Sequence, residues 1–343
     1  MSQDETSNSL PEPKPGEHPF APYVRILGKG KRGSRALSRA EARHAMSMIL
    51  KGEVEQVQLG AFLMLLRVKE EVPEELAGFA DAARDYCRPG APITVDIDWP
   101  SYAGKRRHAP WFIFAIQLLA DAGLRVFIHG DEGHTPGRIY TSDILRELGL
   151  EVATDWYDAA RLIDLQGFCY LPLEQVLPTM SELIDLRPIL GLRSPVHSLA
   201  RLLNPLDAPL VMQGIFHPPY APLHQAASQL LGYERAAVIK GEGGEIERNP
   251  DTSLTVYQSF AREGSIAQED WPPMFERRHV KPDNPGAGQM RAVWNGTLED
   301  EYATGAIVGT AALALKESGR ANTQAEALAM AEGLWQTRDR SRF

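Results

Sequence analysis

The chain has 343 residues, of which 43% are hydrophobic and 24% charged, a composition typical of a globular protein with a large buried core. Its formal net charge of −9 excludes a uniformly basic protein that would coat nucleic acid with its whole surface. Two cysteines, Cys87 and Cys169, exclude a disulfide framework, and the absence of about 18 consecutive apolar residues excludes a membrane span. We therefore expect a cytoplasmic protein of about two domains.

The N-terminal part is expected to be a tail followed by helices. Residues 1–22 are polar and rich in proline, and they are expected to be disordered. Ser38 and Glu41 match a capping box, which predicts the start of a helix that ends at Gly52.

Two further helices are expected, at residues 54–70 and 73–86. The first is apolar on most of its faces, which predicts that it is buried, and Pro73 suits the first turn of the second. Together these helices predict a small domain over residues 23–90, with an apolar face available for docking.

After residue 91, strands alternate with helices, which is the pattern of a largely parallel α/β sheet. Strands are expected at residues 93–97, 125–130, 209–215, 236–241 and 253–258. Helices are expected at residues 110–123, 141–149, 221–232, 299–319 and 323–335. The fold class is therefore α/β: a small N-terminal helical domain plus a large α/β domain with a mainly parallel central sheet. Residues 91–172 and 201–343 are expected to form the large domain, and helices from about 173–200 are expected to join the small one.

Ligands of such sheets bind beyond the carboxyl ends of the strands. This rule places a candidate site among four loops, at residues 98–110, 129–140, 215–222 and 241–251.

Basic residues are concentrated locally although the total charge is negative. Of the 36 Lys and Arg residues, 16 lie in segments that hold only 2 of the 45 acidic residues: 24–43, 101–108, 187–201 and 276–281. A charge acts over about 8–10 Å in salt, so a local positive surface can still attract a polyanion. The candidate phosphate-binding residues are Lys29, Lys31, Arg32, Arg35, Lys105, Arg106, Arg107, His108, Arg193, Arg201, Arg277, Arg278 and Lys281. Tyr102 is expected to stack on an exposed base, whereas Trp111 is expected in the core. The alternative is that the four basic segments are unrelated clusters exposed to solvent and form no common binding surface.

Two long stretches, residues 37–84 and 186–216, resemble anthranilate phosphoribosyltransferases. The first resembles the helical region of that family, and the second resembles the stretch that joins its two domains. The resemblance runs from about residue 37 to the C-terminus. It implies a fold shared with the pyrimidine nucleoside phosphorylases and a homodimer formed through the helical domain.

The family's diphosphate loop, Gly-Thr-Gly-Gly-Asp, is replaced here by "DWPSYAGKRRH" at residues 98–108. The family's glycines let backbone N–H groups close on phosphates. Because Trp99 and Tyr102 are bulky and Pro100 lacks a donor, we do not expect the backbone cradle to form in the same way.

The other motifs of the family are also altered. Its Lys-His-Gly-Asn motif becomes Ile128–Asp131, and its adjacent Asp-Glu metal pair becomes the separated Glu245 and Glu247. Arg187 matches the arginine that contacts anthranilate, but the family's histidine and tyrosine positions fall on Leu177 and Ser181. The resemblance implies a relic substrate cleft formed by His129, Asp131, Arg187 and Glu245.

Two shorter stretches, residues 98–112 and 240–251, resemble the YbiB-type branch of this fold. Members of that branch bind nucleic acid without sequence preference, and no transferase activity is established for them. The resemblance implies a homodimeric DNA- or RNA-binding protein without catalytic residues or a cofactor. The alternatives are a phosphoribosyltransferase or nucleoside-phosphorylase-like enzyme with an altered substrate, which would use magnesium, and a sensor of small anions.

Overall fold

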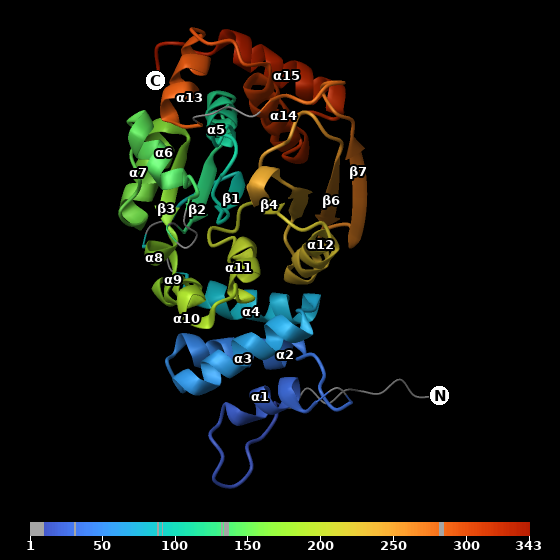
Figure 1. Cartoon of the computed structure of the whole chain (residues 1–343). Coiled ribbons are helices and arrows are strands. Elements are labelled where there is room, and N and C mark those ends of the chain that lie inside the picture. The colour runs from blue at the N-terminus through green and yellow to red at the C-terminus, as the bar shows by residue number, and fades with distance from the viewer. Residues whose placement is uncertain are drawn as a thin grey trace.

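A helical bundle lies at one end of the molecule and an α/β domain forms the rest of it (Figure 1). This computed structural model describes residues 10–30, 32–87, 89–90, 92–131, 133, 137–280 and 285–343. The bundle contains α1 (Ala21–Gly28), α2 (Arg39–Leu50), α3 (Gln56–Lys69) and α4 (Pro73–Tyr86). Short helices lie beside it, namely α8 (Leu173–Val176), α9 (Pro178–Asp185), α10 (Arg187–Leu190) and α11 (Val196–Leu199).

Within the described residues, the large domain has one seven-stranded sheet in the order β3-β2-β1-β4-β5-β6-β7. Its strands are β1 (Ile97–Ser101), β2 (Val126–Gly130), β3 (Phe168–Pro172), β4 (Leu210–Ile215), β5 (Arg235–Lys240), β6 (Leu254–Phe260) and β7 (Ser265–Trp271). The four strands β3, β2, β1 and β4 and their neighbour β5 pair in parallel, whereas β6 is antiparallel to β5 and β7 is antiparallel to β6. The accompanying helices are α5 (Phe112–Asp121), α6 (Thr141–Leu148), α7 (Trp156–Gln166), α12 (Tyr220–Leu231), α13 (Ala287–Asn295), α14 (Glu301–Glu317) and α15 (Gln324–Thr337). This architecture confirms the predicted fold class.

The first strand lies further along the chain than predicted. Residue 97 is the only residue of the predicted strand 93–97 that belongs to β1, where it pairs with Val126 and Leu210. Asp98 and Pro100 have low strand propensity, and for that reason residues 98–100 were predicted to lie in a loop. β3 and β7 were not predicted: β3 is a short apolar run that could equally be helical, and β7 is largely polar and lies at the sheet edge.

Local signals located the helices of the bundle well. Ser38 and Glu41 form the predicted capping box of α2, and Pro73 is in the first turn of α4. The tail is shorter than expected, because Phe20 is fully buried with its ring centroid 5.1 Å from that of Phe62. The prediction that the helix at residues 54–70 is buried is wrong for one face of α3, where Val57 and Val68 are 79% and 83% exposed.

Two large apolar clusters hold the molecule together. One packs α5 and α14 on the sheet and contains Trp111, as predicted, and Trp99. The other joins the sheet to the bundle, since it contains Tyr102 and Phe127 of the large domain together with Phe62 of the bundle. None of the described helices is long and apolar enough to cross a membrane.

Candidate functional site

Two loops meet at the carboxyl ends of β1 and β5, and we call this contact the seam. It consists of residues 101–105 and 241–247, joined by Glu245. One carboxylate oxygen of Glu245, Oε1, accepts the backbone N–H groups of Ala103 (2.7 Å) and Gly104 (2.6 Å). Its other oxygen, Oε2, accepts the hydroxyl of Ser101 at 2.8 Å. Gly104 has a φ of 66°, so the chain turns there into the left-handed region that favours glycine.

Two successive N–H groups that point at one oxygen form an anion-binding concavity. The sequence predicted that the family's backbone cradle would not form in the same way, and this loop does form a cradle of two N–H groups. Trp99 and Pro100 belong to β1, and the cradle is made by the residues that follow them. The anion held in the cradle is a side chain of the protein itself, and Glu245 is only 1% exposed.

A second carboxylate of the same loop binds the basic run. Lys105 is 1% exposed, and its Nζ lies 2.6 Å from Oε1 of Glu247. The other oxygen of Glu247 accepts the N–H of Phe112 at the start of α5, at 2.9 Å. Burial raises the pKa of Glu247 to about 7, while the charge of Lys105 opposes that rise. Lys105 is therefore buried in an ion pair and does not belong to the candidate phosphate-binding surface.

Two arginines lie around the cradle. Nη1 of Arg138 donates to the carbonyl oxygens of Ala103 (2.8 Å) and Gly104 (2.9 Å). Nε of Arg201 donates to the carbonyl oxygen of Gly214 at 2.9 Å. Burial lowers the pKa of Arg201, and the charge of Glu245 acts in the opposite direction. Arg138 was not among the predicted residues, although it lies in the loop 129–140 that the strand pattern marked.

Tyr102 cannot stack on a base, because it is 1% exposed and its ring is covered by the second apolar cluster. Its hydroxyl lies 2.6 Å from Nδ1 of His129, and Nε2 of His129 lies 3.3 Å from Oδ2 of Asp98. These three side chains form a buried chain of polar contacts, and His129 therefore does not line an open cleft. Asp131, also of the expected relic cleft, is 9% exposed and accepts the hydroxyl of Ser181 at 3.4 Å. Arg187 is partly buried at the start of α10.

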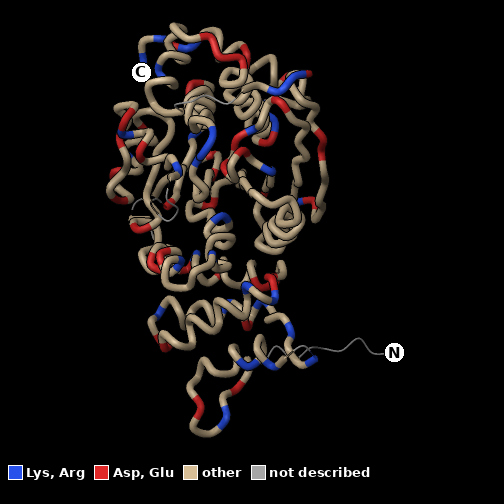
Figure 2. The backbone as a smooth tube through the Cα atoms, in the orientation of Figure 1, with Lys and Arg blue, Asp and Glu red and all other residues tan. Residues whose placement is uncertain are grey.

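The remaining predicted residues divide into three groups. Some are paired or packed: exposed Arg35 pairs with Glu41 at 2.6 Å, exposed Arg277 pairs with Glu301 at 2.5 Å, and the ring of buried His108 stacks on Tyr302. Those that are exposed, and that form no ion pair within the described part of the chain, are Lys29, Arg32, Arg106, Arg107 and Arg278. Lys31 and Lys281 lie outside the described residues. Figure 2 shows Lys and Arg along both domains with acidic residues between them, so the basic segments are not isolated from carboxylates.

Arg193 is partly buried in the connection between the two domains. Burial, together with the charges of Arg138, Arg201 and Arg187, lowers its pKa to about 10. Arginines from the predicted ligand loop 129–140 and from the basic segment 187–201 therefore lie near one another and near the seam.

The enzyme alternative implies a magnesium ion, and the carboxylates of the seam do not fit one. Octahedral Mg²⁺ needs free oxygen ligands, but Glu245 is bonded to amides and Glu247 to Lys105 and an amide. Among the described residues, no group of three or more His, Cys, Asp or Glu side chains could hold a metal ion.

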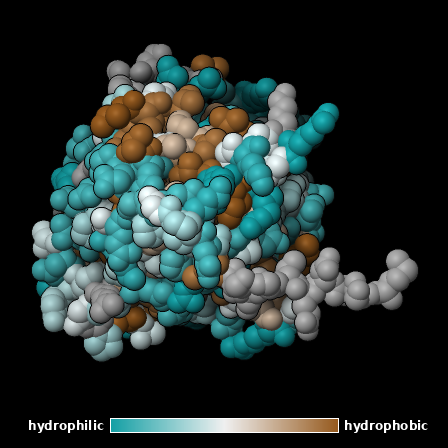
Figure 3. All heavy atoms as spheres, turned by 90° about the horizontal axis from the view of Figure 1, so that it is seen from below, coloured by the Kyte–Doolittle hydropathy of each residue, from teal (hydrophilic) through white to brown (hydrophobic). Residues whose placement is uncertain are grey.

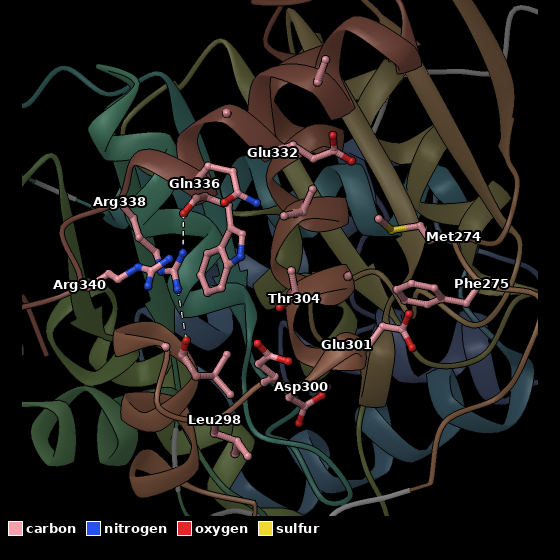
Figure 4. A pocket seen from close by; sticks show the side chains of 18 residues that line it. Met274, Phe275, Leu298, Asp300, Glu301, Thr304, Glu332, Gln336, Arg338 and Arg340 are labelled. Atoms are coloured by element: carbon pink, nitrogen blue, oxygen red, sulfur yellow. Dashed lines mark hydrogen bonds between the residues drawn. The ribbon is translucent and has the colours of Figure 1, made fainter.

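A large hollow of about 900 Å³ lies away from the seam, between α13, α14 and α15. Figure 4 shows Arg338 and Arg340 on one side of it and Phe275 and Glu301 on the other. The guanidinium of Arg338 is held by carbonyl oxygens, including that of Trp335 at 2.5 Å. None of the predicted site residues that the structure describes lines this hollow, and the seam has the position that ligand sites take in such sheets.

A helical bundle joined to an α/β sheet, with an anion cradle at the carboxyl end of β1, defines the class of proteins with a phosphoribosyltransferase-type fold. The chain belongs to the glycosyl transferase family, whose helical bundle domain matches residues 22–87 and whose a/b domain matches residues 114–337.

Named relatives agree with this assignment. The chain is 30% identical over 307 residues to the anthranilate phosphoribosyltransferase of Moorella thermoacetica, which covers 86% of this chain and 89% of that protein. It is 29% identical over 237 residues to the uncharacterized protein YbiB of Escherichia coli, covering 67% of this chain and 73% of that one.

Solved structures show the same fold. Anthranilate phosphoribosyltransferase (TrpD) from Thermus thermophilus superposes with a TM-score of 0.76 at 23% identity, covering 91% of this chain and 94% of that one. The enzyme from Saccharomyces cerevisiae in complex with PRPP and Mg superposes with a TM-score of 0.74 at 18% identity, covering 93% of each chain.

Proposed function

We propose that this protein is a glycosyltransferase of the phosphoribosyltransferase type with an altered substrate site, in which Glu245 takes the place of a phosphate. The observation that carries this proposal is the cradle of Ala103 and Gly104, whose N–H groups lie 2.7 and 2.6 Å from one anionic oxygen. A phosphate oxygen needs the same donors at the same distances. The named transferases among the relatives favour this function over nucleic-acid binding.

A phosphorylated ligand enters the cradle only when the carboxylate of Glu245 leaves it. Arg138 and Arg201 supply positive charge beside the cradle, so an incoming phosphate replaces one anion with another. The separated glutamates and Ile128 in place of the family's lysine distinguish this site from that of the family. The ligand expected here is therefore a phosphorylated ribose bound without the family's metal pair.

Calorimetry with phosphoribosyl pyrophosphate tests this proposal on the wild type and on Glu245→Ala. The variant empties the cradle, and we expect it to bind the ligand at least about tenfold more tightly than the wild type. Glu245→Gln keeps the shape of the side chain but removes its charge, and it should lie between the two. Glu263→Ala, an exposed carboxylate on the β6–β7 hairpin, is the matched control and should resemble the wild type. Absence of binding by both the wild type and Glu245→Ala would reject the proposal.

The second candidate function is sequence-independent binding of DNA or RNA, and the exposure of Arg106 and Arg107 favours it. These side chains follow buried Lys105 on the same loop and are free of ion pairs within the described residues. Backbone phosphates bind to separated cationic points of this kind.

A double variant tests this candidate. Arg106→Ala with Arg107→Ala should weaken oligonucleotide binding equally for all sequences, and it should lower the salt slope by about two. Arg262→Ala, an exposed arginine paired with Glu234, is the control. A slope that stays the same in the double variant would exclude this loop from the interface.

A homodimer through the helical bundle is part of the same proposal. The face of α3 that is turned away from the core carries Val57 and Val68, and Ile189 of α10 is 81% exposed. The two helices adjoin, because a Cβ added to Gly60 would lie 4.0 Å from Leu190. Figure 3, which views the molecule from the bundle end, shows a hydrophobic patch on this side. Large exposed apolar patches mark interaction sites.

The cytoplasmic location remains a prediction. Cys87 and Cys169 are both free and buried, which agrees with a reducing compartment.

A further inference from the structure

A cavity of about 160 Å³ lies where three parts of the chain meet. The last turn of α3 contributes Arg67. Glu71, the second residue after that helix, also lines the cavity. The connecting segment contributes Arg193, Ser194 and Arg201. The segment after β4 contributes Phe216 and His217, and α12 contributes Tyr220 and His224.

Two buried polar atoms in this lining have no hydrogen-bond partner within the described residues. They are Oγ of Ser194, a residue 5% exposed, and Oε2 of Glu71, a residue 7% exposed. Buried polar atoms are nearly always paired, so each such atom needs an explanation. Both belong to residues that line the same cavity. A ligand with an oxygen acceptor and a hydroxyl donor would satisfy them together, because the hydroxyl of Ser194 can donate and Oε2 of Glu71 can accept.

The charges of the lining favour an anion. The lining includes the three arginines Arg67, Arg193 and Arg201 and one carboxylate, that of Glu71. Burial raises the pKa of Glu71, and the charge of Arg67 opposes that rise. Burial lowers the pKa of His224 to about 3, so this histidine adds no charge near neutral pH.

The size of the cavity limits the ligand. At roughly 30 Å³ per water molecule, it holds about five waters, which suits one tetrahedral oxyanion and part of what it is attached to. A whole nucleotide does not fit inside. Arg67 already reaches across the domains to donate to the hydroxyl of Tyr220 at 3.1 Å.

We propose that this cavity binds the phosphate group of a small phosphorylated molecule and thereby ties the helical bundle to the α/β domain. The guanidinium groups of Arg67 and Arg193 bind its oxygens, and the hydroxyl of Ser194 donates to it. The seam takes no part in this site, although Arg201 lies near both. The inference therefore goes beyond the proposed function and does not depend on it.

Calorimetry and thermal unfolding with inorganic phosphate, and separately with ribose 5-phosphate, test the inference on the full chain. We expect the wild type to bind at millimolar concentration or below and to be stabilised against unfolding by the ligand. Ser194→Ala and Arg67→Gln should each weaken binding by about tenfold. Tighter binding of ribose 5-phosphate would identify a sugar phosphate as the ligand, and equal binding would identify phosphate itself.

Arg67 is exposed, so Arg67→Gln should fold normally even if Ser194→Ala does not. Arg262→Gln removes an exposed arginine outside the cavity and serves as the control. If the wild type binds neither compound, or if Arg67→Gln binds as the wild type does, the inference is overturned. Arg67 takes no part in the seam, so Arg67→Gln should weaken binding in the cavity and leave binding at the seam unchanged, and failure here and failure at the seam can be told apart.

Discussion

The seam and the interdomain cavity contain the same kinds of side chain, but their charges are balanced differently. At the seam, Glu245 is bonded to two backbone amides and Glu247 is bonded to Lys105. The cavity is lined by three arginines and one carboxylate, whose pKa is raised by burial. The polar groups of the seam are thus paired with one another, whereas the cavity has a buried hydroxyl, that of Ser194, without a partner within the described residues.

This difference shows that a basic residue in a ligand-binding loop is not by itself a ligand-binding residue. Lys105 and Arg106 are neighbours, yet Lys105 is buried in an ion pair and Arg106 is exposed. The location of the nearest carboxylate decides between these outcomes, because a buried charge must be paired.

The largest expected effect comes from breaking the buried pair of the seam. Glu247→Ala leaves the ammonium group of Lys105 buried without a partner, which should cost about 3–5 kcal/mol of stability. Urea unfolding measures this loss.

The double variant Lys105→Met with Glu247→Met sharpens the test. Replacing both charges with apolar side chains removes the uncompensated charge, so much of the stability should return. A double variant as unstable as Glu247→Ala alone would show that the pair is not what stabilises the seam. Glu263→Ala again provides the exposed control.

The sequence predicted the elements that depend on local signals. The capping box of Ser38 and Glu41 gave the start of α2, and the alternation of strands and helices gave the fold class. β1 was misplaced because its strand character comes from pairing on both sides with β2 and β4, which outweighs the low strand propensity of Asp98 and Pro100.

The candidate site was harder to predict, because its contacts are distant in the sequence. Lys105 and Glu247 are 142 residues apart, so the basic run gave no sign that its first member is neutralised. Ser194, Glu71 and Arg67 have no motif that joins them, and only the packing of the two domains brings them to one cavity. Exposure of Arg106 and Arg107 agrees with the expected solvent-facing loop.

A smaller effect is expected on dimer formation at the exposed apolar face of α3. Unlike the seam and the cavity, this face has no charged groups at Val57 and Val68. Val57→Asp with Val68→Asp places carboxylates in the proposed dimer interface, and desolvating them there is costly. Analytical ultracentrifugation should show a dimer for the wild type and a monomer for this variant. Leu165→Asp, at an exposed apolar position of α7, should leave the dimer intact. A monomeric wild type would remove the dimer from the account.

The smallest expected effect is on the pH dependence of stability, through the protonation of His279. His279 lies 2.7 Å from Asp251 and 2.8 Å from Glu301, and these carboxylates, Glu301 first, raise its pKa above 6.5. The resulting stabilisation is complete below the unfolded pKa and is lost as the pH rises through the folded pKa. Because the cluster is near solvent, we expect the loss to be below about 1 kcal/mol.

Melting temperatures measured from below to above the unfolded pKa of about 6.5 test whether His279 causes this loss of stability. His279→Gln should flatten the decline above pH of about 6.5, whereas His217→Gln, at an exposed histidine outside the cluster, should not. The same decline in His279→Gln as in the wild type would show that another group titrates.

The central claim is that the carboxylate of Glu245 occupies the position of a phosphate in the cradle of Ala103 and Gly104. A crystal structure of Glu245→Ala with pyrophosphate tests it most directly. The account predicts a phosphate oxygen within hydrogen-bond distance of both N–H groups, where Oε1 of Glu245 lies in the wild type. A cradle that stays without pyrophosphate, or that loses its shape once the carboxylate is removed, would contradict it.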